Sequence, residues 1–145
     1  MPAEYLQAFL LLFIMKKAIG FFTILAVAAC NNPKGYQKAE DAQDAGRQFI
    51  EASLQGNYEK ARFYLLKDSV NLPLLEKQES NYQHLSDKEK SQYRDSNIRP
   101  IEIKPLNDSV TNYTYHHTSN MNDTTTLRIV KVNGEWLVDL KSIIR

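Results

Sequence analysis

A histidine pair and two tyrosines in the C-terminal half are the residues best suited to chemistry. His116 and His117 are adjacent, and Tyr113 and Tyr115 precede them at alternate positions. Because successive side chains of a strand point to opposite faces, the two histidines cannot easily hold one metal ion together. The sequence places no His-x-His motif and no cysteine beside them. We therefore predict no metal site.

The same alternation places Tyr113, Tyr115 and His117 on one face of a strand. These three side chains could line a ligand pocket, or they could make cross-strand aromatic contacts. Tyrosine is the commonest aromatic residue of the chain, with 8 copies. Tyrosine-rich faces suit polar ligands and partner surfaces, and they also suit half-buried strands. The sequence leaves both interpretations open.

The carboxylates are poorly placed for catalysis. Asp139 is expected on the strand face opposite to Val138 and Leu140, and Glu102 has the same disposition between two isoleucines. Asp108 falls in an expected turn, where a carboxylate stays hydrated and is a weak general base. No motif pairs a nucleophile with a base. We therefore expect no catalytic residue and no enzymatic activity.

Composition excludes further classes of protein. The chain has 145 residues, which suffices for one domain. Lys plus Arg is 18 and Asp plus Glu is 17, a balance that argues against a nucleic-acid partner. A single cysteine excludes a disulfide framework and a thiolate zinc cluster. With only 5 glycines there is little material for a phosphate-binding loop, so we expect no cofactor.

The elements that must position these residues follow from periodicity and turn signals. Helices are expected over residues 40–55, 58–66, 73–82 and 86–95, and strands over residues 101–103, 110–118, 124–132 and 136–144. Asn133-Gly134 predicts a two-residue hairpin turn, which sets Trp136 opposite Lys131 and Asp139 opposite Arg128. The prediction is an α+β fold, with N-terminal helices packed on one face of a curved four-stranded antiparallel sheet.

The N-terminal region leads to the single cysteine, Cys30. Residues 15–17 include two lysines, residues 18–25 are apolar and residues 26–29 are mostly small, which is the order of a secretory signal peptide. Residues 27–30, Val-Ala-Ala-Cys, resemble a bacterial lipobox. The resemblance implies cleavage after Ala29 and a lipid on the Cys30 thiol that anchors the protein to a membrane. A membrane span over both apolar runs is disfavoured, because it would bury Lys16 and Lys17.

These features divide the chain into four parts. Residues 1–14 are expected to be an upstream start extension, 15–29 a lipoprotein signal peptide, 30–39 a lipidated tether and 40–145 a single α+β domain. No aspartate follows Cys30 directly. By resemblance to enteric lipoproteins, that absence implies that the protein is anchored at the outer membrane of a bacterial envelope, with its domain facing the periplasm.

Three Asp-Ser or Asp-Thr triplets lie in the expected domain. They are similar to the O-glycosylation sequon of envelope proteins in Bacteroidetes, which implies candidate modification at Ser69, Ser109 and Thr124. Turn formation by Asp-Ser and Asp-Thr is the other explanation of these triplets.

Residues 56–61, Gly-Asn-Tyr-Glu-Lys-Ala, join the first two expected helices, and residues 132–138, Val-Asn-Gly-Glu-Trp-Leu-Val, close the sheet. Together they resemble the nuclear-transport-factor-two-like (cystatin-like) superfamily over residues 41–143, and within it small Bacteroidetes-type lipoproteins of unknown function. The resemblance implies a cone-shaped domain, often with a pocket at its open end, and no single activity.

We therefore expect a membrane-anchored envelope lipoprotein whose non-enzymatic domain binds a small ligand or an envelope protein. The alternative is a small ketosteroid-isomerase-like enzyme with a carboxylate in the cone.

Overall fold

The computed structural model describes residues 35–143 of the chain. The expected start extension, the expected signal peptide and Cys30, the expected lipidation site, lie outside these residues. Within the described part, no helix combines the length and the apolar character that crossing a membrane requires.

In the described part of the chain, four helices precede the sheet, as the sequence predicts. They are α2 (Ala42–Leu54), α3 (Tyr58–Phe63), α4 (Asn71–Gln83) and α5 (Asp87–Asp95). Three begin at residues whose side chains accept a backbone N–H bond of the first turn, namely Asp41, Asn57 and Ser86. The predicted capping box between Ser86 and Glu89 is confirmed, with both reciprocal bonds formed.

Four strands form one antiparallel sheet in the order β1-β2-β3-β4. They are β1 (Ile98–Asn107), β2 (Val110–His117), β3 (Asn120–Val132) and β4 (Glu135–Asp139). The predicted α+β meander is confirmed. β1 extends well beyond the predicted residues 101–103, because an edge strand tolerates its two prolines. The pairing with β2 is irregular next to each of them, after Pro100 and after Pro105.

The last hairpin forms at the predicted turn. Asn133 and Gly134 both have positive φ, 50° and 81°, as a type I′ turn requires. The predicted register is also confirmed, with Lys131 opposite Trp136 and Arg128 opposite Asp139. The Lys131 ammonium lies over the Trp136 ring, 5.3 Å from its centroid.

Two expectations about the end of the chain are wrong. The last strand stops at Asp139, and Leu140–Ile143 form a 3-10 turn, η2. The Leu140 N–H donates to the Asn71 side-chain oxygen instead of to a neighbouring strand, at 2.9 Å. Asp139 is buried, with 7% of its surface exposed, because the turn into η2 brings Lys141 back onto it. The Lys141 N–H donates to the Asp139 carboxylate at 3.2 Å, and the Lys141 Nζ lies 3.7 Å from it.

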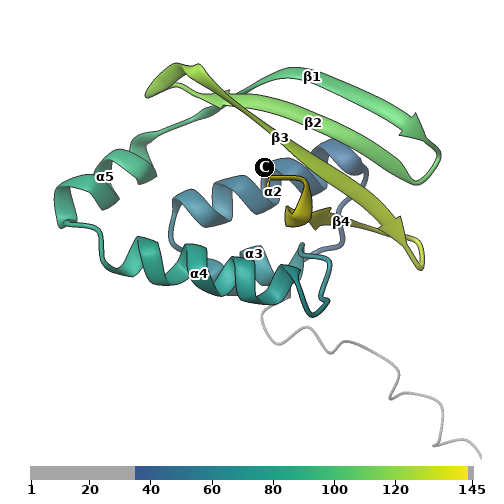
Figure 1. The fold of residues 1–145 in the computed structure, drawn as a ribbon, viewed down its shortest axis with the longest axis horizontal. Coiled ribbons are helices and arrows are strands. Elements are labelled where there is room, and N and C mark those ends of the chain that lie inside the picture. The colour runs from purple at the N-terminus through teal and green to yellow at the C-terminus, as the bar shows by residue number, and fades with distance from the viewer. Residues whose placement is uncertain (1–34, 144–145) are drawn as a thin grey trace, which may run out of the picture. The chain divides into compact units, whose positions relative to one another are not determined.

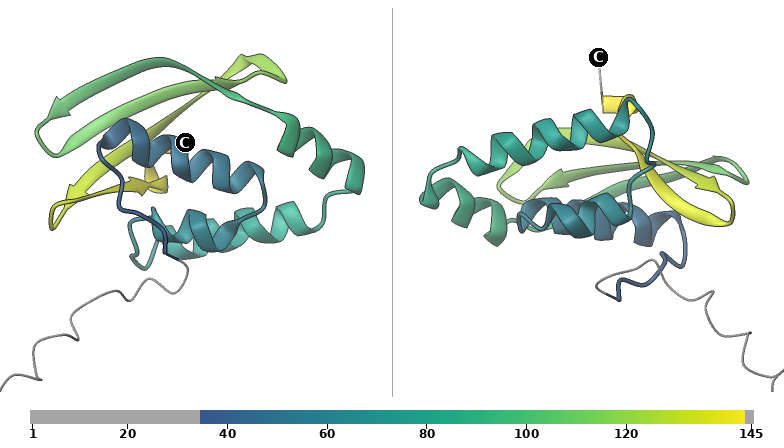
Figure 2. Two further views of the ribbon diagram at one scale, coloured as in Figure 1. Left: turned by 180° about the vertical axis from the view of Figure 1, so that it is seen from behind. Right: turned by 90° about the horizontal axis from the view of Figure 1, so that it is seen from below.

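The sheet curves over α2, and the helices gather on that one face of it (Figures 1 and 2). α2 contacts all four strands and α3. Its residues Ala45, Phe49 and Ile50 are buried against the inner face of the sheet, where Leu127 and Ile129 are buried as well.

Residues 36–39 already belong to the domain, so its contacts begin before the predicted boundary at residue 40. The Tyr36 ring packs on Phe63 with centroids 5.7 Å apart. The Tyr64 hydroxyl donates to the Gln37 carbonyl at 2.8 Å.

Candidate functional site

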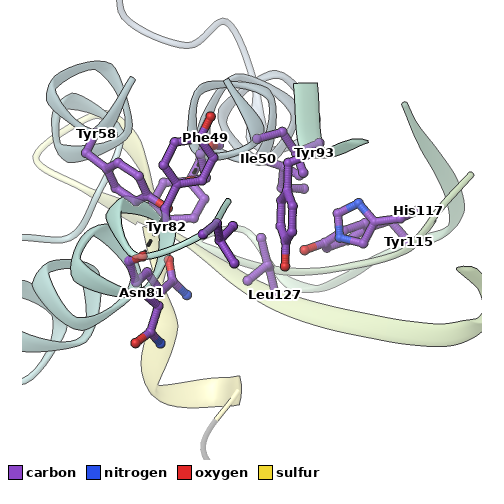
Figure 3. A pocket seen from close by; sticks show the side chains of 13 residues that line it. Phe49, Ile50, Tyr58, Asn81, Tyr82, Tyr93, Tyr115, His117 and Leu127 are labelled. Carbon is purple, nitrogen blue, oxygen red and sulfur yellow. Dashed lines mark hydrogen bonds between the residues drawn. The ribbon is translucent and has the colours of Figure 1, made fainter. Parts of the chain in front are cut away.

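A pocket of about 280 Å³ opens between the helices and the inner face of the sheet (Figure 3). Its walls come from α2, α3, α4, α5, β2 and β3, and most of its lining side chains are aromatic or aliphatic. The lining residues are Phe49, Ile50, Ser53, Leu54, Tyr58, Gln78, Asn81, Tyr82, Leu85, Tyr93, Tyr115, His117 and Leu127. Such an apolar, concave lining with a few polar groups is the usual form of a small-molecule site.

β2 carries all three residues that the sequence singled out, and two of them line the pocket. Tyr113, Tyr115 and His117 share the inner face, and their rings follow one another at centroid distances of 6.0 and 5.3 Å. Tyr115 and His117 line the pocket. Tyr113 is not among its lining residues; it is buried in the core, where a Cβ on Gly46 of α2 would lie 3.2 Å from its ring.

Three tyrosines that sequence reasoning did not select form the helical wall. The rings of Tyr58 and Tyr82 meet edge-to-face at 5.8 Å, and those of Tyr82 and Tyr93 at 6.2 Å. They come from α3, α4 and α5. Of these three tyrosines, only Tyr93 could have been singled out from the sequence, because it is the single large apolar residue of the polar helix α5.

Two tyrosine hydroxyls of the pocket, those of Tyr58 and Tyr115, act as neutral groups. Burial raises the pKa of Tyr58 to about 12, with Tyr82, Glu79 and Tyr93 adding to the effect. The Tyr58 hydroxyl donates to the Gln78 carbonyl at 3.2 Å. Burial likewise raises the pKa of Tyr115 to about 12, against an opposing hydrogen bond with Thr125. Both hydroxyls therefore remain protonated near neutral pH and can donate hydrogen bonds.

His117 is the polar residue of the inner sheet face in this pocket. Burial lowers its pKa below the usual value of 6.5; the Asp123 carboxylate opposes that shift and His116 adds to it. The ring is therefore mostly neutral near pH 7, with one donor and one acceptor nitrogen. Its Nδ1 is buried and has no hydrogen-bond partner among the described residues.

The carboxylates considered for catalysis lie elsewhere. No Asp or Glu is among the residues that line the pocket. Glu102 on β1 and Asp108 in the following turn are exposed, and Asp139 is occupied with Lys141. Within residues 35–143, no three His, Cys, Asp or Glu side chains are grouped so as to hold a metal ion.

The candidate modification sites are on the surface. Ser69, Ser109 and Thr124 are all exposed. The turn explanation also fits the first triplet, because the Asp68 carboxylate accepts the Val70 N–H. At the second triplet, the Ser109 N–H donates to the Asn107 side chain instead.

Comparisons with known proteins find one solved structure with a similar fold. No family model matches the chain, and no curated protein matches it. Among solved structures, it is similar to the crystal structure of an NTF-2 like protein of unknown function from Shewanella oneidensis. The TM-score is 0.47 and the sequence identity 16%, over 65% of this chain and 88% of that chain. The α+β assignment rests on the chain's own helices and strand pairing.

Proposed function

We propose that residues 36–143 form a non-enzymatic binding domain for a small, largely apolar molecule. The observation that carries this proposal is the pocket of about 280 Å³ beside Tyr115 and His117. Its volume is near the lower end of the range for ligand pockets, about 300–1,000 Å³. It suits a ligand the size of one or two fused rings.

The lining supports binding rather than catalysis. It supplies hydroxyls, amides and one imidazole, but no lining carboxylate that could serve as the base of a ketosteroid-isomerase-like enzyme. The core behind it is closed, since Tyr113 and Leu127 are each about 1% exposed. The pocket would therefore already have its shape before a ligand enters it.

We further propose that a lipid on Cys30 holds this domain at the outer membrane, facing the periplasm. The lipobox-like residues 27–30 support this part of the proposal. In a host with the lipidation machinery, the wild-type chain should carry the lipid, and Cys30→Ala should remain an unlipidated precursor. A wild-type chain whose mass shows no lipid would contradict the anchor.

The pocket itself is tested with prodan, a neutral dye with two fused rings that brightens in apolar sites. The wild-type chain should bind it and enhance its fluorescence. Ser53→Phe should weaken that binding, because Ser53 lines the pocket and a larger side chain there would fill it. Ser80→Phe is the matched control, since Ser80 is exposed on α4 and does not line this pocket. Equal dye binding by both variants, or none by the wild type, would refute the proposed function.

A further inference from the structure

A second hollow adjoins the pocket and differs from it in character. It has a volume of about 810 Å³ and lies between α5 and the β2–β3 turn. Leu54, Tyr93 and His117 line both hollows. Tyr93 is 46% exposed, and α5 buries none of its residues. An apolar inner pocket and a polar outer groove therefore share one boundary.

The groove has a negative charge. Glu89, Asp95 and Asp123 line it, and no Lys or Arg lines either hollow. None of these three carboxylates makes an ion pair among the described residues. Glu89 already accepts the capping-box bonds from Ser86, whereas Asp123 lies on the strand side of the groove with His117. A cleft lined by one sign of charge attracts the opposite sign and repels its own.

His117 supplies a hydrogen-bond acceptor at the boundary. Its side chain lines both hollows, and a neutral imidazole has one nitrogen that can accept an N–H bond. The neutral form is the favoured one, since burial outweighs the opposing effect of Asp123 on the pKa of His117. An ammonium group at this point would donate to a neutral nitrogen and face a carboxylate.

We propose that the ligand is a cationic amine with an apolar, ring-sized body. The body occupies the aromatic pocket between Tyr58, Tyr82 and Tyr115, and the ammonium donates to His117 at the boundary and faces Asp123 in the groove. This inference rests on the proposed function, because it specifies the ligand class of the same pocket. Anionic amphiphiles of equal size would bind more weakly, because the charge of the groove repels them.

Three probes with one ring system separate the possibilities. Tryptamine is cationic, tryptophol is neutral and indole acetate is anionic, and each is titrated into the full chain by calorimetry at low salt. Tryptamine should bind about tenfold more tightly than tryptophol, since hydrogen bonds that involve a charged group are the stronger ones. Indole acetate should bind more weakly than tryptophol.

A matched pair of variants locates the charge. Asp123→Asn should weaken tryptamine about fivefold, the scale of one exposed ion pair, and leave tryptophol unchanged. The control is Asp87→Asn, which also removes one negative charge, but from an exposed position of α5 that does not line the groove. It should leave the affinities for tryptamine and tryptophol unchanged. Equal affinities for tryptamine and tryptophol, or equal losses in the two variants, would overturn the amine and leave the pocket standing. Failure of all three probes to bind would overturn the amine and the proposed function together.

Discussion

The N-terminal half of α4 packs into the closed core of the domain, whereas its C-terminal half borders the pocket. Near its N-terminus, Asn71 and Leu75 are fully buried, and the Asn71 side chain links α4 to η2 through the Leu140 N–H. Near its C-terminus, Gln78, Asn81 and Tyr82 line the pocket. One helix thus closes the core at one end and leaves a hollow at the other.

The difference lies in how each end satisfies its polar groups. At the closed end, the Asp68 carboxylate accepts the Asn71 N–H at 2.8 Å and a bond from Lys141 at 2.8 Å. At the open end, the His117 Nδ1 is buried without a partner among the described residues. A fully bonded end contributes stability, whereas an end with free volume and an apolar lining is suited to a ligand.

The largest expected effect is a difference in unfolding free energy between two leucine variants, one at each end of the domain. Leu75→Ala should lower the free energy of unfolding by about 2–5 kcal/mol, since it leaves a cavity in a closed core. Leu85→Ala is the control; Leu85 is only partly buried and lines the pocket, so its loss should cost about 1 kcal/mol. Urea denaturation measures both, and equal losses would remove the contrast between the ends.

The next effect separates two asparagines of α4. Asn71→Ala should lower the free energy of unfolding by about 1–3 kcal/mol, because it leaves the buried Leu140 N–H without an acceptor. Asn81→Ala removes the same group at an exposed position and should change stability by less than about 0.5 kcal/mol. If the Asn71 variant were as stable as the Asn81 variant in urea, the bond to Leu140 would not hold the closed end.

The third effect concerns Gly56, whose backbone lies against the Tyr82 ring at the open end. Gly56 has φ +72°, and a Cβ there would lie 2.5 Å from the Tyr82 ring. Gly134 has φ +81° with no atom within 4 Å of such a Cβ. Either Ala substitution should cost about 1 kcal/mol of backbone strain, but only Gly56→Ala should also displace Tyr82 and change dye binding. Unchanged dye affinity in Gly56→Ala would show that the position of Tyr82 does not shape the pocket.

The local signals of the sequence predicted most of the fold. The Ser86 capping box and the Asn133-Gly134 turn depend on residues close in the chain, and both formed as predicted. The end of β4 could not be predicted, because Leu140 bonds to Asn71, which is distant in sequence. The burial of Asp139 depends on the same turn.

The pocket was predictable only from its sheet side. Strand alternation placed Tyr115 and His117 on one face, since that rule needs no tertiary information. It could not separate them from Tyr113, which shares the face but packs against α2. The helical wall of Tyr58, Tyr82 and Tyr93 depends on how three helices pack together, which periodicity within each helix does not encode.

The smallest expected effect is a pH dependence at the open end. Burial lowers the pKa of His117 below 6.5, so the unfolded chain binds this proton at higher pH than the folded chain. The stability that depends on the neutral ring is therefore complete above about pH 6.5 and declines as the pH falls toward the folded-state pKa. His117→Gln should reduce that decline in thermal unfolding measured across this range. His84→Gln, at an exposed position, is the matched control and should retain it; identical pH profiles of the two variants would count against a buried neutral His117.

The most direct test of the central claim is an NMR titration of the isotope-labelled full chain with tryptophol. We expect saturable shifts at the open end, at Phe49, Tyr82 and Tyr115, and unchanged resonances at the closed end, at Asn71 and Leu140. Shifts confined to the closed end or to the exposed strand β1, or no saturable shift at all, would contradict the assignment of this pocket as the binding site.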